Sequence, residues 1–149
     1  MYRKSWLIGL VASVLIAPSA APAAEAGVIK TVQGDVSIER GAAVLTAELG
    51  LPVQVTDVIV TGPDGVVGIT FEDNALLSLG PGSRLSIGQF RFDSTTHDGA
   101  FETTLTRGRL AVVSGKIAKH KQDAMKVRTP SSILGVRGTE FLVEVSAAP

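Results

Sequence analysis

The sequence predicts an all-β fold, in which a single domain of short antiparallel strands follows an N-terminal signal peptide. The chain of 149 residues contains 16 glycines, and 45% of its residues are hydrophobic. This composition is more typical of a β-rich domain with many turns than of a helical bundle. After Gly27, apolar and polar residues alternate, and turn residues recur about every ten residues. β-Sandwiches and solenoid-like stacks share this spacing, so both architectures stay open.

Residues 1–23 have the three parts of a secretory signal peptide. Arg3 and Lys4 form a basic start, an apolar stretch extends from Trp6 to Ala17, and small residues follow. The alanines place the cleavage between residues 23 and 26. The apolar stretch is too short for a transmembrane helix, which needs about 20 residues. We therefore expect a periplasmic or secreted protein with no membrane span in its mature chain.

The predicted domain covers residues 27–145 and begins with a series of alternating segments. Two turns are expected in the first half of the domain. One is residues 61–65, in which Gly65 is free to take a positive φ angle, and the other is residues 72–74. The strands expected in this half, from their alternation, are 32–38, 53–60, 67–71 and 77–79.

The second half of the domain continues the alternation around one polar loop, residues 93–99. Residues 116–125 are the only segment for which we consider a helix, and no linker or low-complexity stretch divides the domain. The strands expected here are 85–87, 101–105, 110–113 and 141–145.

Composition and motifs exclude several functional classes. The chain has no cysteine, which removes disulfides, thiolate zinc sites and cysteine nucleophiles. Its 14 basic and 14 acidic residues give no support for nucleic-acid binding. No phosphate loop, dinucleotide fingerprint or calcium loop occurs, so we expect no metal, cofactor, catalytic residue or enzymatic activity. A hydrolase would need a deep pocket lined by at least two of Glu72, Asp73, His97 and His120.

A basic segment lies between Arg107 and Arg128, where Asp123 is the only acid. It is interpreted either as a solvated loop and edge strand kept soluble by lysine or as a patch for an anionic glycan or lipopolysaccharide. The candidate residues of such a patch are Arg107, Arg109, Lys116, Lys119, Lys121 and Lys126.

The segment Gly135-Val136-Arg137-Gly138 is the most informative stretch of the chain. Glycines permit close approach by other chain segments, and an arginine between them can pair with a carboxylate. We expect Arg137 to be buried, to pair with a carboxylate such as Asp57 or Asp73, and to hold the last strand against the sheet. The alternative is that Arg137 contacts a partner.

Together with two further motifs, this segment resembles the pattern of the FecR domain family. One is Val127-Arg128-Thr129-Pro130, which precedes Gly135, and the other is Gly50-Leu51-Pro52 followed by Asp57 and the Thr61-Gly62 turn. Asn74 stands where the family often has glycine after the turn aspartate, and asparagine tolerates positive φ. The positions that the resemblance marks as structural or partner-contacting are Asp57, Thr61, Gly62, Asp73, Thr129, Pro130, Gly135, Val136, Arg137, Gly138 and Thr139.

The resemblance implies a periplasmic, all-β domain that binds another envelope protein and has no catalytic activity. FecR-type regulators also carry a cytoplasmic anti-sigma region and a membrane span, which we do not find, so sigma-factor control is not transferred. The expected function is protein–protein interaction in the cell envelope, with a possible role in signalling. An exposed apolar patch or an unpaired edge strand would mark the binding surface. The alternative is binding of an anionic envelope glycan through the basic segment.

Overall fold

The computed structural model describes residues 21, 23–138 and 140–146. Nearly all of the predicted signal peptide, residues 1–23, and also Thr139 therefore lie outside the described residues. The elements within them are β1 (Glu25–Gln33), β2 (Val36–Arg40), β3 (Ala43–Thr46), β4 (Pro52–Gln54), β5 (Val58–Thr61), β6 (Val66–Phe71), β7 (Leu76–Leu79), β8 (Arg84–Phe92), β9 (Gly99–Val113), α1 (Lys116–His120), β10 (Met125–Arg128), β11 (Ile133–Val136) and β12 (Glu140–Val145).

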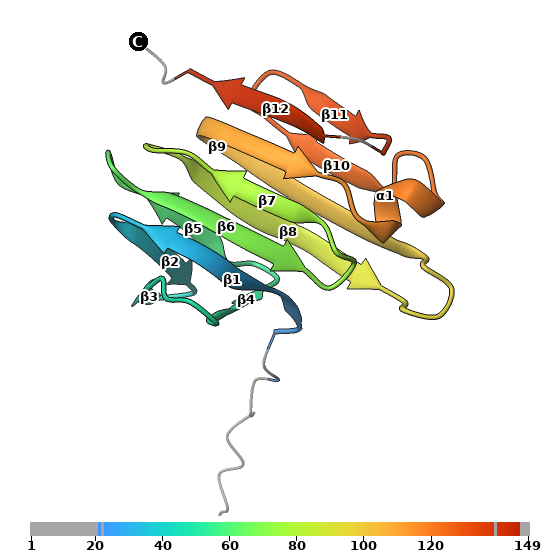
Figure 1. The fold of residues 1–149 in the computed structure, drawn as a ribbon, viewed down its shortest axis with the longest axis horizontal. Coiled ribbons are helices and arrows are strands. Elements are labelled where there is room, and N and C mark those ends of the chain that lie inside the picture. Colours follow the sequence, from blue (N-terminus) through green and yellow to red (C-terminus); the bar gives the residue numbers. More distant parts are fainter. Residues whose placement is uncertain (1–20, 22, 139, 147–149) are drawn as a thin grey trace, which may run out of the picture.

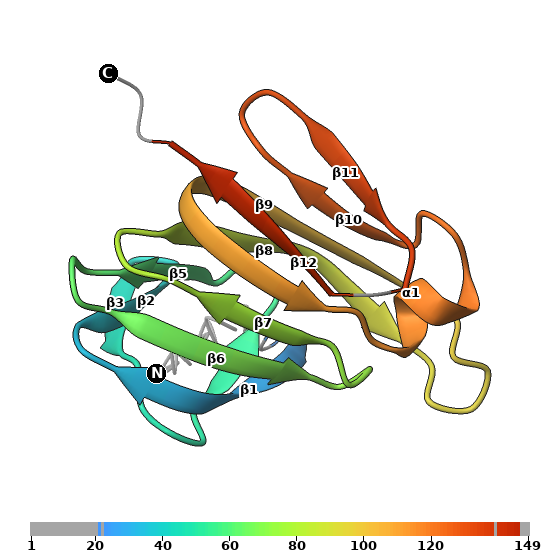
Figure 2. The same ribbon diagram turned by 45° about the horizontal axis from the view of Figure 1, so that its top comes forward.

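These strands form one curled sheet whose two halves share the long strand β9 (Figure 1). Half-sheet A has the order β4-β1-β6-β7-β9-β12. Half-sheet B has the order β3-β2-β5-β8-β9-β10-β11. The sheet folds over along β9, so that the two halves face each other (Figure 2). The prediction of an all-β fold of mainly antiparallel strands is confirmed, with β9–β10 as a parallel pair.

The core lies between the two halves and consists of the inward residue of each alternating pair. Strand β6 shows the pattern clearly, because Val67, Ile69 and Phe71 are buried and their neighbours are more exposed. Phe71 packs on Phe101 of β9 with ring centroids 4.5 Å apart. Burial of such side chains supplies most of the favourable free energy of folding, since each contributes about 1.5–3 kcal/mol.

The chain passes from one half-sheet to the other at several places, and four of these are corners that stack along the left side of Figure 1. Backbone hydrogen bonds join each corner to the next. The Gly62 N–H donates to the Asp35 carbonyl at 2.8 Å, and the Gly82 N–H donates to the Gly62 carbonyl at 3.0 Å. The Gly80 N–H donates to the Arg109 carbonyl at 2.9 Å. The corners comprise residues 34–35, 62–65, 80–83 and 107–109.

Two hydroxyl groups satisfy the backbone inside these corners. Thr61 Oγ1 donates to the Gly80 carbonyl at 2.7 Å and accepts the Ser83 N–H at 2.8 Å. Ser83 Oγ in turn accepts the Arg109 N–H at 2.9 Å. Since Thr61 and Ser83 are buried, these bonds remove the cost of leaving corner N–H groups without partners. This gives Thr61 of the sequence motif a structural role.

Glycine at two of the corners is required by close packing or by backbone conformation. A Cβ on Gly65 would overlap the Asp35 carbonyl oxygen of the neighbouring corner. The expected positive φ at Gly65 is not found, so the reason for glycine there is space. Gly108 does have a positive φ, +94°, and it lies where β9 crosses from half-sheet B to half-sheet A. Asn74 also takes a positive φ, +67°, as expected for the turn after β6.

Several strand predictions were wrong in extent. The expected strands 101–105 and 110–113 are one continuous strand, β9, and the expected strand 85–87 is the start of the longer β8. The expected strand 32–38 is split by the corner at residues 34–35 into β1 and β2, which belong to opposite half-sheets. The expected strand 53–60 is likewise split into β4 and β5 around Thr56, whose φ is +77°. Both halves of each run face the same core, so alternation continues through the bend and conceals it. The helix considered for 116–125 covers only Lys116–His120.

Candidate interaction surface

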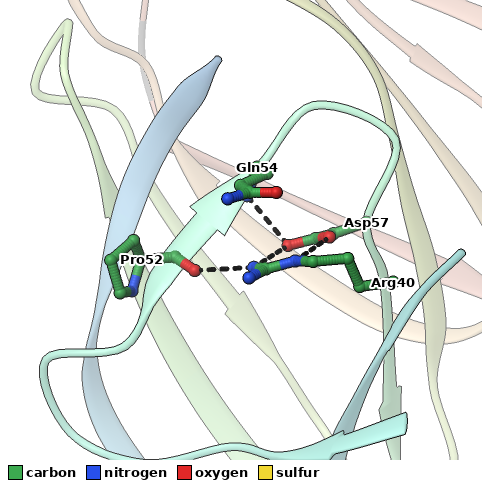
Figure 3. A network of polar contacts seen from close by, with 4 residues as sticks. All are labelled: Arg40, Pro52, Gln54 and Asp57. Carbon is green, nitrogen blue, oxygen red and sulfur yellow. Dashed lines mark hydrogen bonds and ion pairs between the residues drawn. The ribbon is translucent and has the colours of Figure 1, made fainter. Parts of the chain in front are cut away.

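The N-terminal end of the molecule is closed by a polar network around Asp57 (Figure 3). Arg40 of β2 donates through Nε to Asp57 Oδ1 at 2.9 Å and through Nη2 to Asp57 Oδ2 at 2.7 Å. The same Nη2 donates to the Pro52 carbonyl at 2.9 Å. Because β2 belongs to half-sheet B and Pro52 begins β4 of half-sheet A, this guanidinium joins the two halves of the sheet.

Burial makes this network strong. Asp57 is fully buried and its carboxylate also accepts the Gln54 N–H at 2.8 Å, while the Arg40 side chain is 28% exposed. The hydrogen bonds that Arg40 donates to the Asp57 carboxylate raise the pKa of Arg40 above its ordinary value. Two-pronged arginine–carboxylate pairs combine charge with directional hydrogen bonding. Sequence analysis marked Asp57 but missed Arg40, since no local motif connects residues 17 positions apart.

Asp73, the second buried carboxylate, is held in a different way. It lies in the turn between β6 and β7 and accepts the backbone N–H groups of Ala75 at 3.1 Å and Ile117 at 3.3 Å. Burial raises the pKa of Asp73, and these hydrogen bonds oppose the rise only in part. The contact to Ile117 attaches α1 to the turn. Asp73 therefore supports the packing of the helix on the sheet.

In the part of the chain that the structure describes, the C-terminal end of the molecule is open in the corresponding place. The β10–β11 turn and the end of β12 lie on the same side as the four corners, because Arg128 is in register with Thr104 and Val145 with Gly108. A cleft of about 500 Å³ separates them. We call it the C-terminal cleft; it is lined by Thr106, residues 129–132, Leu134 and residues 143–146.

One exposed aliphatic side chain lines the C-terminal cleft, and two others lie on the outer faces of the strands beside it. Leu134 faces into the cleft and is 38% exposed, whereas Ile133 and Leu142 point outward and are 58% and 60% exposed. They belong to β11 and β12, each of which pairs with a single strand among the described residues. The other end also has exposed aliphatics, Val44 at 69% and Leu49 at 70%, and its edge strands β3 and β4 likewise pair with a single strand among the described residues. The feature that distinguishes the C-terminal end is therefore the cleft between β11 and β12.

The residues of the Gly135 segment have separate roles. Gly135 is contacted by the Asp123 side chain, which a Cβ would displace, and Val136 is buried. Arg137 is exposed, so the expectation of a buried arginine was wrong. Its expected partner Asp57 binds Arg40 instead, because Arg40 is brought beside it by the β2–β5 pairing. Gly138 has a positive φ of +33°, and Thr139 lies outside the described residues.

Thr129 and Pro130 form the wall of the C-terminal cleft on the β10–β11 side. The Thr129 N–H donates to the Ser132 carbonyl at 2.8 Å, and Thr129 Oγ1 accepts the Ser132 N–H at 3.0 Å. These bonds close the turn within the segment. The turn therefore keeps its shape without contacting β12.

The six residues of the proposed anionic patch do not gather on one surface. Arg107 and Arg109 flank the corner at Gly108, and Arg109 contacts Glu144 at 3.3 Å. The four lysines, Lys116, Lys119, Lys121 and Lys126, are at or near the opposite end, where α1 and the start of β10 lie. Lys121 and Lys126 line a cleft of about 250 Å³ together with the acids Asp98, Glu102 and Asp123. This mixed lining lowers the attraction for a polyanion.

The groups considered for hydrolysis are also dispersed. His97 and His120 are exposed, and Glu72 and Asp73 lie in a turn that lines neither of the clefts described above. Within residues 21, 23–138 and 140–146, no group of three or more His, Asp or Glu side chains is placed to hold a metal ion. In that same part of the chain no helix combines the length and hydrophobicity needed to cross a membrane.

A family comparison matches most of the region described above. The family described as FecR protein matches residues 57–149, which is more than half of the chain. The chain belongs to the FecR family. No curated protein and no solved structure matches it significantly. The FecR match begins at Asp57 and covers the corners from Thr61 onward and the whole C-terminal cleft, whereas Arg40 precedes it.

Proposed function

We propose that this FecR-family chain is an exported, non-enzymatic domain that binds another protein in the cell envelope. The observation that carries the proposal is the open C-terminal end, with its cleft and the exposed aliphatic residues of β11 and β12. Exposed apolar side chains beside unpaired strand edges are typical of protein-binding surfaces. Membership in the FecR family supports a regulatory, protein-binding role in the envelope.

The start of the fold supports export with cleavage after Ala23. The Ala24 carbonyl accepts the Val55 N–H at 3.1 Å, and Ala26 is fully buried in the core. Cleavage after residue 26 would remove these contacts, whereas cleavage after Ala23 leaves them intact. N-terminal sequencing of the protein from the periplasm would show Ala24 as the first residue if this is correct, and a retained Met1 would contradict export.

The binding surface can be tested by photo-cross-linking in intact cells. A photoreactive amino acid is placed at Leu142 or Ile133 in the full chain, and at Val44 as a control of similar exposure on the opposite end. We expect a discrete adduct with one envelope protein from the first two positions and none from Val44. Equal adducts from all three positions, or none from any, would contradict the proposed surface.

Salt separates the protein partner from the anionic glycan. Contacts with a polyanion weaken steeply as ionic strength rises, because the charges are screened over about 10 Å at 0.1 M salt. The adduct with a protein should therefore form at both low and high salt. Capture of polysaccharide alone, lost at high salt, would favour the glycan alternative.

A further inference from the structure

We infer that the partner binds by adding one β-strand to the free edge of β12, and that this strand carries basic residues on its outward face. The inference rests on the proposed protein-binding function and specifies the chemistry of the partner. Strand addition combines backbone hydrogen bonds, which supply affinity, with side-chain positions that supply specificity.

The backbone of β12 offers hydrogen-bonding groups at three outward positions. The Arg109 carbonyl faces β7, where it accepts the Gly80 N–H, so Gly108, Leu110 and Val112 face β12. Their partners in register are Val145, Val143 and Phe141. The alternating residues of β12 direct their N–H and C=O groups to the free edge. These residues are Glu140, Leu142 and Glu144.

Half-sheet A is one strand shorter than half-sheet B on this side. Within residues 21, 23–138 and 140–146, half-sheet B continues beyond β9 with β10 and β11, whereas half-sheet A continues with β12 alone. The inward face of β11 is consequently covered only in part: Val136 is buried, but Leu134 remains exposed to the C-terminal cleft. A strand added to β12 would lie opposite β11 and bury Leu134. A strand added to β11 would leave more of half-sheet B uncovered.

The outward side chains of β12 determine the charge of the added strand. Glu140, Leu142 and Glu144 share the outward face, in register with Val113, Ala111 and Arg109 of β9. Arg109 contacts Glu144 at 3.3 Å and shares its charge, so Glu140 contributes the larger part of the negative charge that an added strand would meet. If a second copy paired with β12 in antiparallel fashion about Leu142, Glu140 would lie opposite the partner's Glu144. Like charges opposite one another destabilise strand pairs, whereas lysine or arginine at those positions would stabilise them. The complementary strand therefore alternates basic and apolar residues outward and has apolar residues inward.

Synthetic peptides test this pairing directly. In the first nine-residue peptide, lysine, leucine and lysine occupy alternate central positions that would face outward, and valines occupy the positions between them. The second peptide has glutamates in place of the two lysines. Fluorescence anisotropy with the full chain should show saturable binding of the lysine peptide and about three-fold to five-fold weaker binding of the glutamate peptide. This difference is expected when Glu140 meets one peptide charge in full and Glu144, which Arg109 also contacts, meets the other. Equal affinity for the two peptides would overturn the inference.

Two substitutions at one position separate the backbone edge from the side chain. Leu142→Pro removes an N–H that faces the free edge and leaves the β9–β12 hydrogen bonds in place, since proline is tolerated at such edge positions. Leu142→Thr keeps that N–H and removes the exposed leucine. We expect the proline variant to lose binding by at least about ten-fold and the threonine variant to retain it within about three-fold. Equal binding by both variants would overturn strand addition.

A charge reversal provides a test that does not depend on proline. Glu140→Lys should reverse part of the discrimination, so that the glutamate peptide gains and the lysine peptide loses affinity. Unchanged discrimination would overturn the assigned register. Failure of every peptide to bind would also overturn strand addition, whereas a cellular adduct from Leu142 would still support the proposed function by another binding mode.

Discussion

The two ends of the curled sheet are built from similar strands but differ in how they close. At the N-terminal end, Arg40 reaches from half-sheet B to the Pro52 carbonyl of half-sheet A and binds the buried Asp57. At the C-terminal end, β11 and β12 part around a cleft of about 500 Å³. The four corners between the two ends hold the halves together by backbone hydrogen bonds.

The difference indicates a division of roles. Residues of the closed end and the corners have their polar groups satisfied internally and should affect stability. Residues of the open end combine exposed apolar side chains with a cleft between two strands, and they should affect binding. The predictions below test this division, from the largest expected effect to the smallest.

Asp57→Ala should remove about 3 kcal/mol of stability, because it leaves the partly buried Arg40 guanidinium and the Gln54 N–H without their acceptor. Thermal and urea unfolding would measure the loss. Asp98→Ala is the matched control, since its contact with Arg91 is exposed and 3.8 Å long, and such pairs contribute about 0–1 kcal/mol. Equal effects for the two variants would refute the role of the closed end.

Gly65→Ala should cost about 2 kcal/mol, because the new Cβ would overlap the Asp35 carbonyl and force two corners apart. Gly88→Ala is the control, as its Cβ would make only an ordinary contact with the Glu102 carbonyl at 3.5 Å. The two free energies of unfolding should differ clearly, with the control near neutral. A Gly65 variant as stable as the control would show that the corners are not closely packed.

Asp73→Asn should change how stability depends on pH. Burial raises the folded-state pKa of Asp73 above its usual value of 3.8. Protonation of Asp73 stabilises the folded state fully at pH values below the usual pKa of 3.8, and this stabilisation is lost as pH rises through the higher folded-state pKa. The melting temperature of Asp73→Asn relative to the natural chain should therefore increase with pH from 3 upward. A difference that stays constant over pH 3–7 would contradict a raised pKa.

Leu134→Ser should have the smallest effect on stability, about 1 kcal/mol, since the side chain is already partly exposed. It should nevertheless weaken the photo-cross-linked adduct from Leu142, because the added strand would cover this residue. Val44→Ser at the closed end should leave the adduct unchanged. Loss of the adduct in both variants would remove the distinction between the two ends.

Much of the fold could be predicted from local patterns, whereas the pairing of distant residues could not. The turns at residues 61–65 and 72–74 were placed correctly because Pro63 and Asn74 favour turn conformations locally. The partner of Asp57 was wrong because several arginines were available and only the β2–β5 register selects Arg40. The sequence did not predict that the binding surface lies at β11 and β12. Their residue patterns resemble those of covered strands, and only the sheet topology determines which strands lack a second neighbour.

By itself, the sequence determined the strand class, the turn positions and the absence of cysteine chemistry, all of which depend on residue type and local spacing. The tertiary structure alone decided which alternating runs bend into opposite half-sheets, which cation binds Asp57, and which edge is left open. The physical reason is that alternation reports only that a side chain faces a core. The opposing strand that completes this core is set by long-range pairing, and at β12 the chain itself leaves that position free within the described residues.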